Sequence, residues 1–291
     1  MSYAWVLNLD ADLELARAGY SPTRAVRASM RPHVERLAGT LLGPGDVLVD
    51  ETCEPGCASG LVGRAFCPTA RALVLLERAG ATPERHPSQA ILREVNGRAF
   101  CASLGQTMPE AAFVETLEAA LAKLEHPPVL AAQWRVKRAF GMAGRGQRVV
   151  RPGIVSASDQ AFLRTSVAEQ GGVMIEPNVT IVRELGMHAM LAETGDLRVG
   201  QLVEQRCDAF GQWLETMVSD DAAHAPWDAL TAEVRHVATA LHGAGYFGPF
   251  GIDAFVYRDA AGAEHLQPRS EINARYSMGF AVGMRMDPRQ P

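Results

Sequence analysis

The chain has 291 residues, of which 47% are hydrophobic, so it can bury one large core or two to three smaller ones. Its formal net charge of -5 argues against a protein built to coat nucleic acid. The sequence has no apolar run long enough to cross a membrane, and Asp10, Asp12 and Glu14 soon follow the first apolar stretch, so we expect a cytoplasmic protein.

The five cysteines are an odd and scattered set, which argues against a disulfide framework. They are Cys53, Cys57, Cys67, Cys101 and Cys207. Cys53 and Cys57, with Cys67 downstream, are the best candidates for a metal site, but a second matched pair is missing. Ordinary buried thiols are therefore the favoured interpretation, and a structural metal stays the alternative.

Residues 1–90 predict a small α/β domain with a parallel sheet. The runs AWVLNLD and DVLVD read as strands on either side of a helical stretch that Pro32 interrupts and Gly43 stops. A second helix, PTARALVLLERAGA, ends near Gly80. Strands that alternate with helices are typical of parallel sheets.

Residues 107–124 predict a helix, because Thr107 and Glu110 fit a capping box and Pro109 falls in the first turn. The run VLAAQWRVKRAF, the turn GMAGRG and the run QRVVRPG then predict two strands joined by a glycine-rich turn. A helix with Ser156 and Asp159 at its start should end at Gly171, followed by the strand VMIEPNV.

The glycine-rich turn predicts free backbone N–H groups of the kind that cradle phosphate. It is not a Walker A loop, which ends in Gly-Lys-Ser/Thr, and Val149 occupies the third glycine position of a dinucleotide fingerprint. A plain hairpin is the alternative. The chain retains only two lysines, Lys123 and Lys137, among 28 Lys and Arg residues, so Lys137 beside this turn suggests a point charge for phosphate. A surface strand lysine is the other interpretation.

Near the C-terminus, PFGIDAFVYRD and HLQPRSEINAR predict an antiparallel hairpin that turns at Gly262. Opposed residues of such a pair have a constant index sum, which places Asp253 beside Glu271, with Asn273 on the diagonal. Two adjacent carboxylates raise each other's pKa unless a cation compensates, and hard oxygen ligands suit Mg²⁺.

The same period of two predicts that Arg269 and Arg275 share the face of Glu271 and Asn273, where they could bind phosphate or a substrate carboxylate. A solvated strand held by salt bridges is the alternative reading of this hairpin.

The lysine strand, the glycine-rich turn, the strand MIEPNV, a later glutamate and the Asp…Glu-x-Asn hairpin resemble, in that order, the ATP-grasp superfamily. The resemblance covers roughly residues 91–280, and its most specific part is the EIN motif with the upstream Asp. It implies an α+β fold in which two lobes, residues 91–176 and 177–291, clamp ATP behind the α/β domain of residues 1–90.

The resemblance implies a set of nucleotide contacts. Lys137 resembles the lysine that contacts the phosphates, and Gly144, Arg145 and Gly146 resemble the flexible loop that covers them. The hinge around adenine would be Ile175, Glu176 and Val179, and Glu184 would hold the ribose. Arg98 stands where the family usually has an earlier lysine.

The resemblance also implies Mg²⁺ ligands and a catalytic arginine. Asp253, Glu271 and Asn273 resemble the metal ligands, and Arg275 resembles a basic residue near the transferred phosphate, where it would act with Lys137. The segment GPFGID lacks the arginine that some members carry two residues before the metal-binding Asp.

The activity that the resemblance implies is a ligase that forms a carbon–nitrogen bond. ATP would activate a small-molecule carboxylate as an acyl phosphate, and an amine or other nucleophile would displace the phosphate. A phosphotransferase on the same scaffold and a nucleotide-binding protein without turnover stay alternatives. We expect ATP and Mg²⁺ as cofactors, no nucleic-acid or membrane partner, and a possible homodimer.

Overall fold

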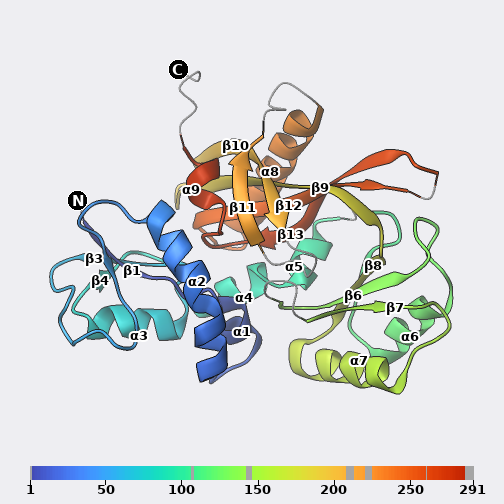
Figure 1. Cartoon of the computed structure of the whole chain (residues 1–291), viewed down its shortest axis with the longest axis horizontal. Helices are drawn as coiled ribbons and strands as arrows, with labels where there is room; N and C mark the ends of the chain where they lie inside the picture. Colours follow the sequence, from blue (N-terminus) through green and yellow to red (C-terminus); the bar gives the residue numbers. More distant parts are fainter. Residues whose placement is uncertain are drawn as a thin grey trace.

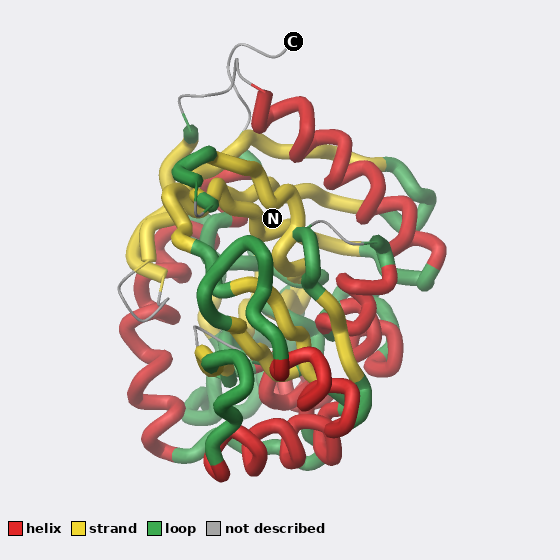
Figure 2. The backbone as a smooth tube through the Cα atoms, turned by 90° about the vertical axis from the view of Figure 1, so that its right-hand side faces the viewer, coloured by secondary structure: helices red, strands yellow, loops and turns green. Residues whose placement is uncertain are grey.

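The computed structural model describes residues 2–105, 108–141, 146–207, 213–219, 225–259 and 261–285. Within these ranges the strands form three sheets (Figure 1). The helices lie mainly around the outside of the strands, which occupy the middle of the molecule (Figure 2). No helix in the described part of the chain is long and apolar enough to span a bilayer.

The N-terminal sheet is parallel, with the strand order β2-β1-β3-β4, which confirms the predicted α/β arrangement. Its strands are β1 (Tyr3–Val6), β2 (Val47–Leu48), β3 (Val62–Ala65) and β4 (Thr82–Pro83). The helices of this region are α1 (Ala11–Ala16), α2 (Arg24–Leu41) and α3 (Ala70–Arg78). The predicted interruption at Pro32 is wrong, because α2 continues through it and packs against a helix near the C-terminus; one proline removes a single hydrogen bond and does not end a helix held by tertiary contacts.

The middle sheet is antiparallel, with the order β5-β8-β6-β7. It comprises β5 (Ala112–Val114), β6 (Trp134–Arg138), β7 (Gln147–Val150) and β8 (Val173–Pro177), with the helices α6 (Leu117–Glu125) and α7 (Ala157–Gln170). Val136 and Ile175 of the sheet pack against Leu124 of α6 and Leu163 of α7. The Ser156 capping box and the left-handed Gly171 at the end of α7 are as predicted.

The predicted helix over residues 107–124 is wrong in its first half. Residues 112–114 form β5, which pairs with β8, and α6 starts at Leu117 with Thr116 as its N-cap. Thr107 lies outside the described residues, and Glu110 has a φ of 63°, which no α-helix contains. The short apolar run AAFV takes up strand geometry because β8 offers an edge to pair with, which no local pattern reveals.

The large sheet has the order β11-β10-β9-β12-β13. Its strands are β9 (Thr180–Leu191), β10 (Leu197–Cys207), β11 (Trp213–Val218), β12 (Gly248–Arg258) and β13 (Glu264–Asn273), with the helix α8 (Ala225–Gly243). Three short helices, α4 (Gln89–Val95), α5 (Arg98–Ser103) and α9 (Phe280–Gly283), complete the described fold.

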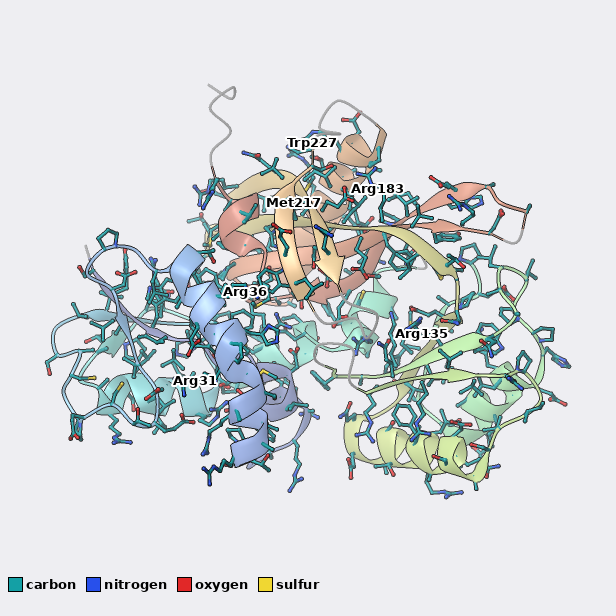
Figure 3. The ribbon with its side chains drawn as sticks, viewed as in Figure 1. Arg31, Arg36, Arg135, Arg183, Met217 and Trp227 are labelled. Atoms are coloured by element: carbon teal, nitrogen blue, oxygen red, sulfur yellow. The ribbon has the colours of Figure 1, made fainter. Side chains whose placement is uncertain are left out.

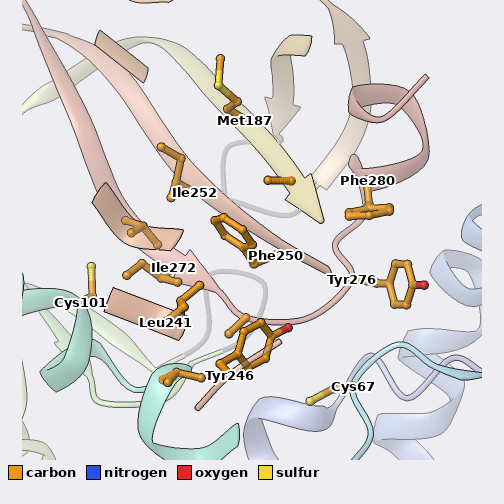
Figure 4. Close-up of a cluster of buried hydrophobic side chains, with 14 of the residues drawn as sticks. Cys67, Cys101, Met187, Leu241, Tyr246, Phe250, Ile252, Ile272, Tyr276 and Phe280 are labelled. Atoms are coloured by element: carbon orange, nitrogen blue, oxygen red, sulfur yellow. The ribbon is translucent and has the colours of Figure 1, made fainter. Parts of the chain in front are cut away.

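One face of the large sheet forms the main core (Figure 4). Met187, Phe250, Ile252 and Ile272 point from the strands into this cluster, and Leu241 joins them from α8. Side chains alternate along a strand, so the residues next to these in the strands, including Asp253 after Ile252, lie on the opposite face of the sheet.

Candidate active site

The β12–β13 hairpin has the predicted register at its inner end. Asp253 lies directly opposite Glu271, and Gly251 lies opposite Asn273. Gly262 occupies the turn with a φ of +88°, a conformation that favours glycine. The index arithmetic therefore placed the two carboxylates side by side correctly.

A β-bulge changes the outer half of the hairpin. The ladder shifts between Asp253 and Phe255, so that Phe255 lies opposite Gln267. Arg269 is thereby turned to Glu233 of α8, with which it forms an ion pair, and to the carbonyl oxygen of Gly105. The guanidinium of Arg269 is thus engaged by protein groups, and the prediction that Arg269 shares the face of Glu271 stays a prediction, because the ladder is irregular at this point.

Asp253 accepts a hydrogen bond at each carboxylate oxygen. The amide nitrogen of Asn273 donates to Oδ2 at 2.9 Å, and Nε2 of Gln205 on β10 donates to Oδ1 at 3.1 Å. Burial, followed by the charge of Glu271, raises the pKa of Asp253 to about 6, and the two amides offset part of that rise. The expected rise in pKa beside a second carboxylate is therefore present at Asp253.

Arg98, the first residue of α5, links the hairpin to the middle sheet. Its Nη2 donates to Oε2 of Glu271 at 2.8 Å, and its Nη1 donates to the carbonyl oxygen of Arg138 at 2.7 Å. Burial alone would lower the pKa of Arg98, but the charges of Glu271, Glu176 and Asp12 raise it above its ordinary value. Arg98 thus lies where carboxylates from all three sheet regions converge.

Asn96, just before α5, fixes the backbone beside the metal-ligand candidates. Its Nδ2 donates to the carbonyl oxygen of Ala274 at 3.2 Å, and its Oδ1 accepts from the Ala274 N–H at 2.9 Å. Ala274 separates Asn273 from Arg275, so one buried amide orients both neighbours. No pattern in the sequence indicates this contact, because a lone asparagine at a helix end is common.

Arg275 follows the end of β13 and turns towards the N-terminal region, so it does not continue the strand face as predicted. Its Nη2 and Nε donate to the two carboxylate oxygens of Asp12 at 2.7 and 3.2 Å. Its guanidinium also lies over the ring of Phe66, 5.1 Å from the centroid. Burial alone would lower the pKa of Arg275, but the charges of Asp12 and Glu271 raise it, and the charge of Arg275 in turn lowers the pKa of Asp253.

The middle sheet contributes a buried ion pair on the face that lacks the α6–α7 core. Nζ of Lys137 on β6 lies 2.6 Å from Oε1 of Glu176 on β8, and both side chains are largely buried. Arg135, two residues earlier on the same strand, donates to Oδ1 of Asn178 at 2.7 Å (Figure 3). The predicted phosphate lysine and the predicted hinge glutamate are thus brought into direct contact.

The other predicted nucleotide residues differ in placement. The Ile175 side chain lies in the α6–α7 core, so only its backbone faces the strand connection. Val179 packs with Met108 and Phe255, next to the connection between β8 and β9. Glu184 lies opposite Phe255 in the ladder, on the same face of the large sheet as Asp253.

Gly144 and Arg145 of the predicted phosphate turn lie outside the described residues. Gly146 has a φ of +78°, and its carbonyl oxygen accepts from the N–H of Arg138 at 2.9 Å. This contact closes the β6–β7 hairpin next to Lys137.

A cavity of about 310 Å³ lies between the middle sheet and β13. Phe113, Met174 and Glu176 line it from the middle sheet, and Gln267 and Ser270 line it from β13. The space between the two sheets is therefore open beside the Lys137–Glu176 pair.

The oxygen groups of the hairpin fit Mg²⁺. Asp253, Glu271 and Asn273 supply two carboxylates and an amide, and Mg²⁺ accepts few protein oxygens because it keeps several waters. The raised pKa of Asp253 marks a buried negative charge that a cation would offset. Among the described residues, no three His, Cys, Asp or Glu side chains form a group that could hold a metal, and this includes Cys53, Cys57 and Cys67.

No protein-family model and no curated protein matches the sequence. Solved structures do match over nearly the whole chain. Biotin carboxylase from Campylobacter jejuni, in a β-γ-ATP complex, has a TM-score of 0.54 at 11% identity over 98% of this chain and 72% of its own. D-alanyl-alanine synthetase A from Vibrio cholerae has a TM-score of 0.53 at 12% identity over 97% and 91%.

N5-carboxyaminoimidazole synthetase from Staphylococcus aureus, complexed with ADP, has a TM-score of 0.52 at 13% identity, covering 99% of this chain and 79% of its own. Identities this low carry information on the fold alone. The similarity extends through the N-terminal, middle and large sheets, as the resemblance of the sequence implied. The chain therefore has the ATP-grasp fold.

Proposed function

We propose that the protein is an ATP-dependent ligase that activates a small-molecule carboxylate and joins it to an amine or another nucleophile. The observation that carries this proposal is the apposition of Asp253 and Glu271 beside Asn273, with Arg98 and Arg275 close by. Oxygen ligands for a divalent cation next to cations for phosphate suit the transfer of a phosphoryl group.

In the proposed reaction, a carboxylate oxygen of the substrate attacks the γ-phosphorus of ATP. The bond between that phosphorus and the β–γ bridging oxygen breaks, and ADP leaves with the electron pair. The amine nitrogen then attacks the acyl carbon, the carbon–oxygen bond to phosphate breaks, and the nitrogen loses a proton to solvent. The products are ADP, phosphate and the joined acid and amine.

The chain's own residues bind and orient the reactants. Lys137 and Arg98 contact the phosphates, Glu176 and Val179 border the base, and Glu184 holds the ribose. Asp253, Glu271 and Asn273 would hold Mg²⁺, which would neutralise charge at the phosphate oxygens when bound. Arg275 lies nearest the transferred phosphate, where Asp12 fixes its orientation. The resemblance of the sequence implies that Gly144, Arg145 and Gly146 would belong to a loop that keeps water from the acyl phosphate.

Two further observations support the proposal. Of the three solved structures described above, two are synthetases and one is a carboxylase, and two of the three hold an adenine nucleotide. The cavity beside Glu176 lies where the resemblance of the sequence puts the hinge around the base.

The test is an isotope experiment with MgATP, an amine mixture and a panel of carboxylic acids labelled with ¹⁸O in the carboxylate. We expect ADP release only with a suitable acid, and one ¹⁸O atom in the released phosphate. ADP release without a carboxylate, with phosphate transferred to a hydroxyl compound, would identify a phosphotransferase. Tight nucleotide binding with no turnover would identify a binding protein.

The metal residues are tested in the same assay. Glu271→Gln and Asp253→Asn should each lower Mg²⁺-dependent turnover by at least about a hundredfold, because each removes one anionic ligand. Glu264→Gln is the matched control, since Glu264 lies on the same hairpin and pairs only with exposed Arg258 among the described residues. Full activity in the first two variants contradicts the metal assignment.

A further inference from the structure

Gln205 reaches across a strand to the carboxylate of Asp253. Gln205 lies on β10 and Asp253 on β12, and β9 separates the two strands in the sheet. Neighbouring strands lie about 4.8 Å apart, so side chains two strands apart rarely touch. Here Nε2 of Gln205 nevertheless donates to Oδ1 of Asp253 at 3.1 Å.

Gly186 on β9 provides the space for this contact. It lies directly opposite Asp253 on one side and Val203 on the other, and Glu184, two residues earlier, lies opposite Gln205. A Cβ atom at position 186 would lie 2.8 Å from Nε2 of Gln205. The backbone of Gly186 does not need a positive φ, so the requirement for glycine here is one of space.

The contact completes the set of donors to Asp253. Asn273 donates to Oδ2 at 2.9 Å, so both carboxylate oxygens accept from a neutral amide. Glu271, by contrast, is paired with the guanidinium of Arg98. An amide orients a carboxylate without cancelling its charge, whereas a second cation at Gln205 would compete with a metal ion.

We propose that Gln205 is a positioning residue that fixes the orientation of Asp253 as a ligand of the Mg²⁺ that accompanies the nucleotide. Gly186 leaves the space through which the side chain of Gln205 reaches Asp253. This inference rests on the proposed function, because it assigns Asp253 to the metal. It adds a residue on β10, which carries none of the predicted ligands, and it explains why β9 has a glycine beside the site.

The test measures Mn²⁺ binding to the full chain with saturating ADP, by electron paramagnetic resonance, and separately ADP binding without metal, by calorimetry. Gln205→Met keeps the length and volume of the side chain and removes the donor. We expect the dissociation constant for Mn²⁺ to rise about tenfold or more, because losing a group that orients a metal ligand typically costs 10- to 100-fold. Metal-free ADP binding should stay within twofold of that of the unmodified chain.

Gln201→Met is the matched control. Gln201 lies on the same strand, and its Nε2 donates to the carbonyl oxygen of Arg285, away from Asp253. This variant should bind Mn²⁺ as the unmodified chain does. Equal Mn²⁺ affinity in Gln205→Met and Gln201→Met overturns the inference.

Gly186→Ala supplies an independent variant that keeps Gln205. The added methyl group displaces the amide, so Mn²⁺ binding should weaken to a similar extent, and Gly186→Ala with Gln205→Ala should be no weaker than Gln205→Ala alone. Additive losses overturn the role of Gly186. The unmodified chain and Gln201→Met test the proposed function itself. If both bind ADP but neither binds Mn²⁺ together with it, the metal site of the proposed function fails, and the inference fails with it.

Discussion

At the scale of single residues, the candidate site is a set of buried charges that neutralise one another. Lys137 pairs with Glu176, Arg98 with Glu271, and Arg275 with Asp12. Burial of any one of these charges alone would cost several kcal/mol, so each pair holds its members in place. A bound nucleotide would give the cations phosphate partners in exchange for these carboxylates.

Lys137→Met should weaken ADP binding about tenfold or more, because a charged contact to phosphate is lost. Calorimetry with ADP measures the effect. Lys123→Met is the matched control, since Lys123 is the other lysine of the chain and lies over the ring of Trp134, outside the site. The combined variant Lys137→Met with Glu176→Gln also removes the carboxylate charge of Glu176, which would otherwise be buried without its partner. Unchanged ADP affinity in this combined variant excludes Lys137 from the site.

The buried side chain of His188 should make the free energy of unfolding depend on pH. It lies on the same strand as Gly186, packed against Gly251 and Gly283, and burial lowers its pKa from 6.5 to about 4. As the pH falls, this histidine binds a proton near pH 6.5 in the unfolded chain but only near pH 4 in the folded chain. The contribution of neutral His188 to the free energy of unfolding is therefore fully present above pH 6.5 and is lost as the pH falls.

Urea unfolding should show a free energy of unfolding that drops by about 2 kcal/mol between pH 7 and pH 5 through this group. His188→Gln should reduce the pH dependence by that amount, whatever its effect at pH 7. An identical pH dependence in the variant would show that folding does not lower the pKa of His188.

At the scale of elements, the connection between α4 and α5 supports the end of the β12–β13 hairpin. Asn96 binds the backbone of Ala274, and Arg98 binds Glu271. The contacting residues are two positions apart in the connection and three positions apart in the hairpin, so the two segments lie side by side here. A shift of either element would move Glu271, Asn273 and Arg275 at once.

Asn96→Ala should therefore lower the free energy of unfolding by about 1–3 kcal/mol and also lower turnover, since the backbone groups of Ala274 lose their partners. Asn8→Ala is the comparison, because Asn8 makes the same pair of bonds to the backbone of Cys67 in the N-terminal region. Both variants should lose similar stability, measured by urea unfolding. Steady-state turnover should fall further in Asn96→Ala than in Asn8→Ala, and an equal or greater loss in Asn8→Ala would contradict the assignment.

At the scale of the whole molecule, the N-terminal and large sheets share one core. Trp5 of β1 packs edge-on against Tyr276, and the N–H of Tyr276 donates to the carbonyl oxygen of Phe66 at 3.0 Å. The ion pair of Asp12 and Arg275 lies at the same junction. The boundaries near residues 90 and 176 stay predictions, but contacts at this junction bring the N-terminal region to the site.

Asp12→Asn should lower turnover while ADP affinity stays within about twofold, because Asp12 orients Arg275 and lies away from the Lys137–Glu176 pair. Steady-state kinetics and calorimetry separate the two quantities. Asp12→Glu keeps the charge and should recover part of the activity. Equal turnover in Asp12→Asn and the unmodified chain would show that Arg275 needs no such partner.

The sequence by itself determined the local features. The alternation of strands and helices predicted the parallel N-terminal sheet, the Ser156 box and Gly171 bounded α7, and the index sum about Gly262 paired Asp253 with Glu271. Each of these depends on residues within one element or one hairpin, where periodicity and capping act. The sequence also indicates Lys137 and Glu176 as nucleotide contacts, but it does not indicate that they contact each other.

Only the tertiary structure decided which charges meet and which residues orient the site. Arg98 and Glu271 are 173 positions apart, and Asp12 and Arg275 are 263 apart. The β5 strand, the bulge beside Arg269, and the reach of Gln205 past Gly186 depend likewise on partners from distant elements. Local periodicity carries no information about such contacts, because they arise only when separate sheets and helices pack together.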